Sequence, residues 1–261
     1  MNRLKEKEES IQDTLNRCNY IGSKIIYYDS IGSTMEEARR LIEGTKEAIP
    51  DGTVVIAEEQ TAGRGRYGRY WHSPPDGIYL SILFYREIEP QKQGLLSLMA
   101  GVVSCKVIMR YIKKTGKNVN IKWPNDILVE DKKICGTLIE KLGNYYSVGI
   151  GINSNTEEFP QNFIIEPTSI YLETGRKILN DFFIVKFLTI FDSYYSSLVE
   201  RDYKRIIKDW KSLTSTKPGK KVKLRTPKEE NDVIIRGIDE NGFLVVEDTE
   251  GNLETIVSGE I

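Results

Sequence analysis

The sequence is organised around one stretch, Gly63-Arg64-Gly65-Arg66-Tyr67-Gly68-Arg69-Tyr70-Trp71, which combines three glycines, three arginines and three aromatic residues. Glycine lets a backbone bend sharply and approach a ligand closely, and arginine offers a planar fork that binds phosphate or carboxylate. We therefore expect a flexible loop that closes over a negatively charged reactant. The alternative interpretation is a solvated basic loop that binds nothing.

The same glycines satisfy the pattern G-x-G-x-x-G, which in dinucleotide-binding folds stands where a helix begins. Here Pro74-Pro75 follows, and a helix cannot run through two consecutive prolines. Residues 77–82 then read as a β-strand. The pattern therefore does not indicate a dinucleotide-binding fold.

Length, charge and composition exclude several classes of protein. The 261 residues can bury a full core and form one large or two smaller domains. With 37 basic and 38 acidic residues, the formal net charge is −1, which does not indicate bulk electrostatic binding to nucleic acid or membrane. Three widely spaced cysteines and a single histidine predict no metal site. No signal peptide or membrane-spanning run is expected, which is typical of a soluble, cytoplasmic protein.

Residue patterns divide the chain into a short N-terminal extension, 1–23, a large domain, 24–214, and a small C-terminal domain, 215–261. The extension is charged, with a frayed start and a short helix at 9–16. Ser33 and Glu36 form a capping box that predicts a helix from residue 34 to residue 44. Periodicity predicts the rest of the large domain: strands at 24–28, 53–57, 77–82, 120–122, 127–129, 134–140 and 145–152, and helices at 95–112, 181–200 and 203–213. Strands at 221–225, 232–238, 243–247 and 253–257 predict a β-barrel of about fifty residues.

A second dense stretch reads Lys122-Trp123-Pro124-Asn125-Asp126 and joins two strands through a turn. Another turn leads to Lys133 and Gly136, so Asp126, Lys133 and Gly136 are expected on two adjacent strands. The alternatives are a plain turn at 125–126 and a solvated hairpin tip at 132–133.

Further polar and glycine positions are compatible with a ligand. Gly149 and Gly151 strip one strand face of side chains, so that a flat group or another backbone can pack there. The hydroxyls of Ser33 and Thr34 at a helix N-terminus can bind a polar ligand, although capping alone would explain them. Gln60 at a strand end offers one donor and one acceptor, or is simply exposed.

Taken together, these motifs resemble those of the biotin–protein ligases. Met35 stands where many members have Asn, so the side-chain contact of that Asn is not expected here. Tyr67 and His72 lie at variable positions, and no catalytic role is expected for His72. No segment corresponds to the N-terminal DNA-binding domain of bifunctional members, which implies a monofunctional ligase that binds no nucleic acid. The matching segments, from about residue 24 to the end, are Gly32-Ser33-Thr34, Gln60–Trp71, Lys122–Asp126, Lys133-Ile134-Cys135-Gly136, Gly149–Asn153, Gly237–Gly242 and Val257–Ile261.

The resemblance implies an α+β fold. A mixed β-sheet with helices on one side, similar to the class II aminoacyl-tRNA synthetase core, would form the catalytic ligase domain, and an SH3-like barrel would follow. The implied reaction attaches biotin to a lysine of a biotin carboxyl carrier protein domain through biotinyl-5′-adenylate. Biotin and ATP are the implied substrates, and Mg²⁺ enters with the nucleotide. Homodimers occur in the family, and open strand edges would allow one here.

The resemblance also implies residue roles. Arg64, Lys133 and Asp126 are expected to be catalytic, with Asp126 orienting the incoming lysine amine. Two alternatives stay open: a lipoate–protein ligase, which shares the fold but lacks the GRGRxG loop, and a non-catalytic biotin- or nucleotide-sensing module. The expected biotin contacts are Ser33, Thr34, Gln60, Gly63, Arg64, Gly65, Arg66, Lys133 and Gly136. The expected ATP and adenylate contacts are Arg64, Arg66, Trp71, Lys133 and Asn153.

Overall fold

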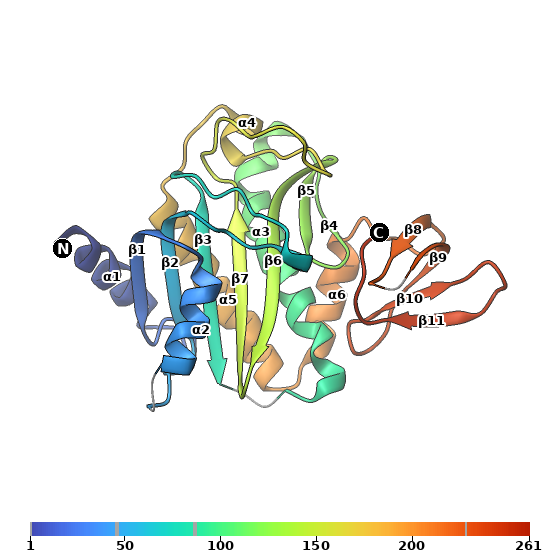
Figure 1. Ribbon diagram of the computed structural model, residues 1–261, viewed down its shortest axis with the longest axis horizontal. Coiled ribbons are helices and arrows are strands. Elements are labelled where there is room, and N and C mark those ends of the chain that lie inside the picture. The colour runs from blue at the N-terminus through green and yellow to red at the C-terminus, as the bar shows by residue number, and fades with distance from the viewer. Residues whose placement is uncertain (1, 45–46, 86–87, 228) are drawn as a thin grey trace.

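The larger part of the molecule is a seven-stranded mixed β-sheet (Figure 1). The computed structural model describes residues 2–44, 47–85, 88–227 and 229–261. Its strands follow the order β1-β2-β3-β7-β6-β5-β4, in which β1 and β2 are parallel and all other neighbours antiparallel. The bounds are Ile25–Ile31 (β1), Thr53–Gln60 (β2), Ile78–Tyr85 (β3), Val119–Lys122 (β4), Asp126–Val129 (β5), Lys132–Leu142 (β6) and Tyr145–Ile152 (β7).

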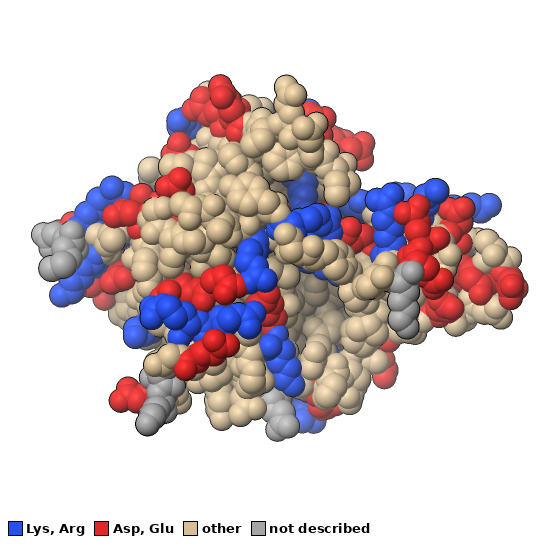
Figure 2. All heavy atoms as spheres, in the orientation of Figure 1, with Lys and Arg blue, Asp and Glu red and all other residues tan. Residues whose placement is uncertain are grey.

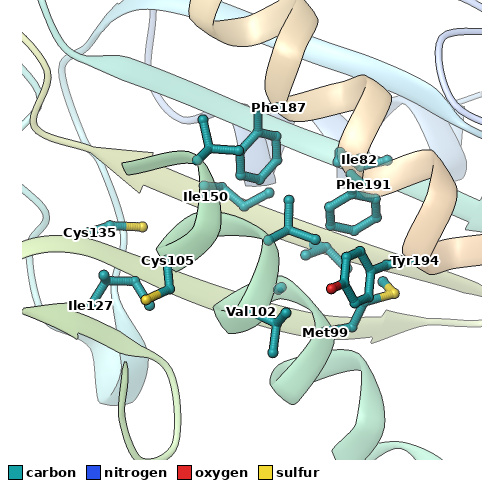
Figure 3. Close-up of a cluster of buried hydrophobic side chains, with 14 of the residues drawn as sticks. Ile82, Met99, Val102, Cys105, Ile127, Cys135, Ile150, Phe187, Phe191 and Tyr194 are labelled. Carbon is teal, nitrogen blue, oxygen red and sulfur yellow. The ribbon is translucent and has the colours of Figure 1, made fainter. Parts of the chain in front are cut away.

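Three helices pack behind this sheet and close the main hydrophobic core: α3 (Gly94–Ile112), α5 (Asn180–Val199) and α6 (Tyr203–Leu213). Side chains of α3, α5 and the sheet meet in this core (Figure 3). By length and composition the segments of α3 and α5 could cross a membrane, so the expectation that no apolar run reaches that length was wrong. Most of their residues are buried within the fold, and this burial accounts for their apolar composition.

One helix, α2 (Thr34–Gly44), lies on the opposite face, which corrects the expectation of helices on one side only (Figure 1). Successive residues of a strand point to opposite faces. Ile150 of β7 enters the core, whereas a Cβ built on Gly149 would lie 2.5 Å from the Sδ of Met35 in α2. The absent side chain at Gly149 therefore lets the start of α2 pack closely against the sheet.

The N-terminal segment is one continuous helix, α1 (Asn2–Leu15), so the expectation of a frayed start before a short helix was wrong. Tertiary contacts stabilise this charged helix. Ile11 and Leu15 are buried, and Glu8 Oε1 accepts the backbone N–H of Tyr27 in β1 at 2.8 Å. As a result, α1 covers part of the outer edge of β1.

The other edge strand, β4, is bridged by the linker that follows α6. Ile121 forms a parallel bridge with Thr214, and Ser215 N donates to Ile121 O at 3.0 Å. Within the described residues, each edge of the large sheet thus carries a segment of the same chain. The edges expected to be open are therefore covered in part, and the homodimer stays a prediction.

After the linker, the chain forms a four-stranded antiparallel sheet in the order β11-β10-β9-β8, beside α6 (Figure 1). The four predicted strands are confirmed close to their predicted ranges. Arg225 and Glu260 form an antiparallel bridge, which returns the C-terminal tail to the free edge of β8. The bounds are Lys221–Arg225 (β8), Glu230–Ile238 (β9), Leu244–Glu247 (β10) and Leu253–Ile256 (β11).

Candidate functional site

A cavity of about 910 Å³ crosses the face of the large sheet that carries α2 and extends to the small sheet. Its lining includes, in sheet order, Gln60 on β2, Gly151 on β7, Lys133 on β6, Asp126 on β5 and Lys122 on β4. Figure 2 shows basic side chains gathered near the middle of this face. The fold thus brings both dense motifs to one cavity. Of the residues expected at the site, only Gly63 is absent from the lining. The residues that do line the cavity are Ser33, Thr34, Gln60, Arg64, Gly65, Arg66, Trp71, Asp126, Lys133, Gly136 and Asn153.

One end of the cavity is a buried chain of polar side chains at the start of α2. Gln60 Oε1 accepts the backbone N–H of Thr34 at 2.9 Å and the Thr34 hydroxyl at 3.1 Å. Ser81 Oγ donates to Thr34 Oγ1, and Gln60 Nε2 donates to Ser73 Oγ, both at 2.9 Å. Ser33 Oγ accepts the N–H of Met35. These bonds fix the orientation of the Gln60 amide and the two hydroxyls beside the cavity.

The glycine-stripped strand face lies under the Trp71 ring. Gly136 and Gly151 are direct partners on β6 and β7. A Cβ on Gly151 would lie 2.5 Å from Trp71 Nε1, and one on Gly136 would lie 3.0 Å from the same ring. Of the two glycines over which a flat group was expected, Gly151 is covered by the indole, whereas Gly149 packs against Met35. The indole Nε1 is buried without a hydrogen-bond partner among the described residues.

Lys133 on β6 and Asp126 on β5 form an ion pair in the cavity, with Lys133 Nζ 2.6 Å from Asp126 Oδ1. The ammonium group also lies 5.3 Å from the centre of the Trp71 ring, within cation–π range. Backbone bonds hold Lys133 in place, because its N–H donates to Glu166 O at 2.8 Å and its O accepts from Thr168 N at 2.9 Å. The site thus pairs one cation and one anion on a rigid sheet.

The arginine loop is anchored at three points. Arg64 forms an ion pair with Glu36 of α2, so Glu36 does not complete the capping box that the sequence predicts. Arg66 Nη1 donates to Gly259 O at 2.9 Å, and Arg69 pairs with Glu260, so the C-terminal tail holds the other side of the loop. These tail contacts were not predicted from the sequence.

Gly63 lies at the base of this loop rather than in the cavity lining. Its carbonyl accepts the N–H of Trp71 at 2.9 Å, and a Cβ there would lie 2.5 Å from Ser73 Oγ. Gly63 therefore allows close packing at the loop base, and its expected contact with biotin stays a prediction.

A segment that sequence reasoning missed, residues 159–167, also lines the cavity. It carries apolar side chains such as Phe159 and Phe163, and Phe163 is 39% exposed. Asn153 lines the cavity, but its Nδ2 donates to Thr168 O at 2.9 Å, so part of this side chain holds the end of that segment. His72 lies beside Phe159, and burial lowers the pKa of its imidazole. The available signal was a cluster of apolar residues in an aperiodic, proline-containing stretch.

The described residues contain no cluster of three or more His, Cys, Asp or Glu side chains that could hold a metal ion. Cys105 and Cys135 are buried in the core, and burial raises the pKa of each thiol to about 12. Neither thiol is positioned or ionised for nucleophilic chemistry at this cavity.

Sequence comparisons match both parts of the chain to known families. Residues 28–155 match the biotin/lipoate A/B protein ligase family, and residues 219–261 match the biotin protein ligase C-terminal domain. The chain is 32% identical over 249 residues to the bifunctional ligase/repressor BirA of Bacillus spizizenii, which covers 92% of this chain and 74% of that protein. It is 28% identical to the biotin–[acetyl-CoA-carboxylase] ligase of Paracoccus denitrificans, covering 84% of this chain and 92% of the relative.

The fold is also similar to those of solved biotin protein ligases. The biotin protein ligase from Aquifex aeolicus in complex with biotin and ATP superposes with a TM-score of 0.76 at 28% identity. The match covers 91% of this chain and 97% of that one. The similarity therefore includes both the large sheet and the C-terminal part.

Proposed function

This chain belongs to the biotin/lipoate A/B protein ligase family and is a biotin–protein ligase, and from that premise we propose that it works through biotinyl-5′-adenylate. Biotin and ATP would first form the adenylate. A lysine of a biotin carboxyl carrier protein domain would then accept the biotinyl group. The observation that carries this proposal is the Lys133–Asp126 pair on the cavity floor, with one charge suited to each half-reaction.

In the first half-reaction, a biotin carboxylate oxygen bonds to the α-phosphorus of ATP and pyrophosphate leaves. Negative charge then gathers around phosphorus, and preorganised cations are the usual means of stabilising it. Lys133 and Arg64 are the cations that we assign to this role, with Arg66 assisting. Lys133 is 25% exposed, so water screens its charge only in part.

In the second half-reaction, the amine of the carrier lysine attacks the mixed anhydride and AMP leaves. Lysine arrives as an ammonium ion and must lose a proton to react. Asp126 is the carboxylate that we assign to this task, because it already holds an ammonium group, that of Lys133, at 2.6 Å. A second ammonium group could bind the same carboxylate and transfer its proton there.

The two ends of the cavity suit the two substrates. The buried hydroxyls and amide around Thr34 and Gln60 would hydrogen-bond the ureido ring of biotin. Trp71, with Asn153 and the apolar segment 159–167, would enclose the adenine. Because the described residues offer no dedicated metal cage, Mg²⁺ would enter on the phosphates of ATP, the usual mode for this ion.

The proposal also includes the finer features of the fold. We assign an SH3-like barrel to the C-terminal sheet because the Arg225–Glu260 bridge brings the tail after β11 back to β8. For the large sheet, we retain the expected likeness to the class II aminoacyl-tRNA synthetase core, and for the protein a cytoplasmic location.

One incubation tests the proposed function. The protein is mixed with biotin, ATP and a biotin carboxyl carrier protein domain, and the mass of the carrier domain is measured by mass spectrometry. We expect a gain of one biotinyl group that requires ATP and is lost when the target lysine of the carrier is replaced by arginine. A gain with lipoate instead would identify a lipoate ligase, and no gain with either would indicate a binding module.

A further inference from the structure

Arg64, the loop arginine that lines the cavity, is paired in this structure with carboxylates that do not line it. Its Nη1 forms an ion pair with Glu36 Oε1 of α2, and its Nη2 lies 3.9 Å from Glu140 Oε1 of β6. Figure 2 shows acidic and basic side chains side by side at the place of α2. A cation that we assign to the reacting charges is therefore also bound by anions outside the cavity lining.

Only the side chain of Arg64 has to move for it to change partner. Its backbone forms an antiparallel bridge with Tyr70, and Trp71 N donates to Gly63 O at 2.9 Å beside it. The Arg64 side chain is 41% exposed and that of Glu36 is 47% exposed, so water reaches both groups. Ion pairs as exposed as this one are weak. The pair between Arg64 and Glu36 is thus one that another anion can break.

A second arginine of α2, Arg39, keeps both carboxylates paired when Arg64 leaves them. Its Nη2 donates to Glu140 Oε2 at 2.9 Å, and its Nε lies 3.7 Å from Glu36 Oε2. Each glutamate thus lies near two arginines, of which only Arg64 lines the cavity. Removing one partner of a partly buried pair is costly because the other charge is left uncompensated. Arg39 prevents that cost here, above all at Glu140, which is 20% exposed.

We propose that Glu36 is a positioning residue that holds Arg64 until the carboxylate of biotin takes its place. This inference rests on the function proposed above, in which Arg64 meets the reacting charges. The carboxylates of Glu36 and of biotin have the same charge and the same pair of acceptor oxygens, so they compete for one guanidinium group. Only the molecules in which Arg64 has left Glu36 bind biotin with full affinity, which lowers the apparent affinity. Glu36 thus sets how tightly this chain binds biotin, although it does not line the cavity.

The test compares biotin with biotinamide, its uncharged amide, by calorimetric titration of each variant. Glu36→Gln frees Arg64 and should tighten the binding of biotin about two- to five-fold, which is the range of one exposed ion pair. Arg39→Met leaves Arg64 as the cation shared by Glu36 and Glu140, so the binding of biotin should weaken by a similar factor. Arg39→Lys should return it toward the wild-type value. Biotinamide carries no carboxylate, so its affinity should stay the same in all variants.

Glu43→Gln is the matched control, because Glu43 is exposed on the same helix and does not line the cavity. It should bind both compounds as wild type does. General damage to α2 would weaken the binding of both compounds in every variant. The proposal instead requires opposite changes for Glu36→Gln and Arg39→Met, confined to biotin. Thermal unfolding curves check that each variant is folded, and Glu36→Gln keeps the test valid if Arg39→Met is not.

The outcomes separate this inference from the function on which it rests. If wild type does not bind biotin, both are overturned. If it binds biotin but attaches none to a carrier domain, the proposed reaction fails, and the comparison of biotin with biotinamide still decides the role of Glu36. If Glu36→Gln binds biotin no more tightly than an active wild type does, the role of Glu36 alone is wrong. Equal changes for biotin and biotinamide would also overturn that role, because the effect would not depend on the carboxylate.

Discussion

Lys133 Nζ lies 2.6 Å from Asp126 Oδ1, across the neighbouring strands β6 and β5. The two side chains are only 25% and 18% exposed. Removing one member of such a pair leaves the other charge uncompensated in a poorly solvated place. Substrates can exchange partners without that cost, because a phosphate can take Lys133 while an ammonium group takes Asp126. We therefore expect mutation of Lys133 to slow adenylate formation and mutation of Asp126 to slow transfer to the carrier.

Lys133→Ala should nearly abolish adenylate formation and leave the fold intact. Loss of a preorganised charge-stabilising donor typically slows a reaction by ~10²–10³. Pyrophosphate release from biotin and ATP measures this step. The control is Lys132→Ala, because Lys132 is 46% exposed and pairs with Glu166 outside the cavity lining. A Lys133→Ala rate within a few-fold of wild type would exclude the assigned role.

Asp126→Ala should slow transfer to the carrier while adenylate still forms. An anion at this position would repel ATP, so its loss should not impair the first step, whereas loss of a general base typically costs ~10²–10⁴. Single-turnover experiments with enzyme preloaded with adenylate measure transfer alone. Asp126→Asn retains the shape of the side chain without its charge and should be equally slow. If adenylation falls as far as transfer, Asp126 organises the shared site instead.

How far the sequence predicts this site depends on the range of the contacts. The strand and turn at Lys122–Asp126 and the strand with Lys133 follow from local patterns, and they lie on adjacent strands as predicted. The alignment of Gly136 with Gly151 depends on the β6–β7 register, which the alternation of glycines does not specify. The bond from Arg66 to Gly259 joins residues 193 positions apart, and no local propensity encodes it.

Arg66→Gly should release the adenylate before transfer. We expect Arg66 to exchange its present contact with Gly259 O for the anionic intermediate, so its loss removes both a loop anchor and a retaining charge. A charge-assisted hydrogen bond contributes roughly 1.5–3 kcal/mol, enough to raise escape about ten-fold or more. Released adenylate acylates exposed lysines, so biotin labelling of an added bystander protein measures escape.

Ser258→Ala is the matched control for that experiment. It removes the weaker 3.3 Å contact between Arg66 and the tail but keeps the guanidinium group. Labelling should therefore stay near the wild-type level in Ser258→Ala. Equal labelling by Arg66→Gly and wild type would show that another group retains the intermediate, whereas equal increases in both variants would assign retention to the tail contact.

Gly151→Ala should weaken ATP binding more than biotin binding. The new Cβ would lie 2.5 Å from Trp71 Nε1. The strand cannot retreat, because β7 is hydrogen-bonded on both sides, with Gly151 paired to Tyr79 on β3 and to Gly136 on β6. The indole of Trp71, which we assign to cover the adenine, must therefore shift. The biotin contacts assigned to Thr34 and Gln60 are held by bonds between those two residues and not by the indole ring, so they should be retained.

The measurement is the KM for ATP and the KM for biotin, determined separately for Gly151→Ala. Loss of one aromatic contact should raise the KM for ATP by about ten-fold, with the KM for biotin nearly unchanged. Gly44→Ala is the control, since a Cβ there meets no atom within 4 Å. A thermal unfolding curve checks the fold, because overpacking costs roughly 1–3 kcal/mol of stability. Equal rises in both KM values would mean that Trp71 supports the whole cavity rather than the nucleotide side, and unchanged values would mean that the ring already moves away when ligands bind.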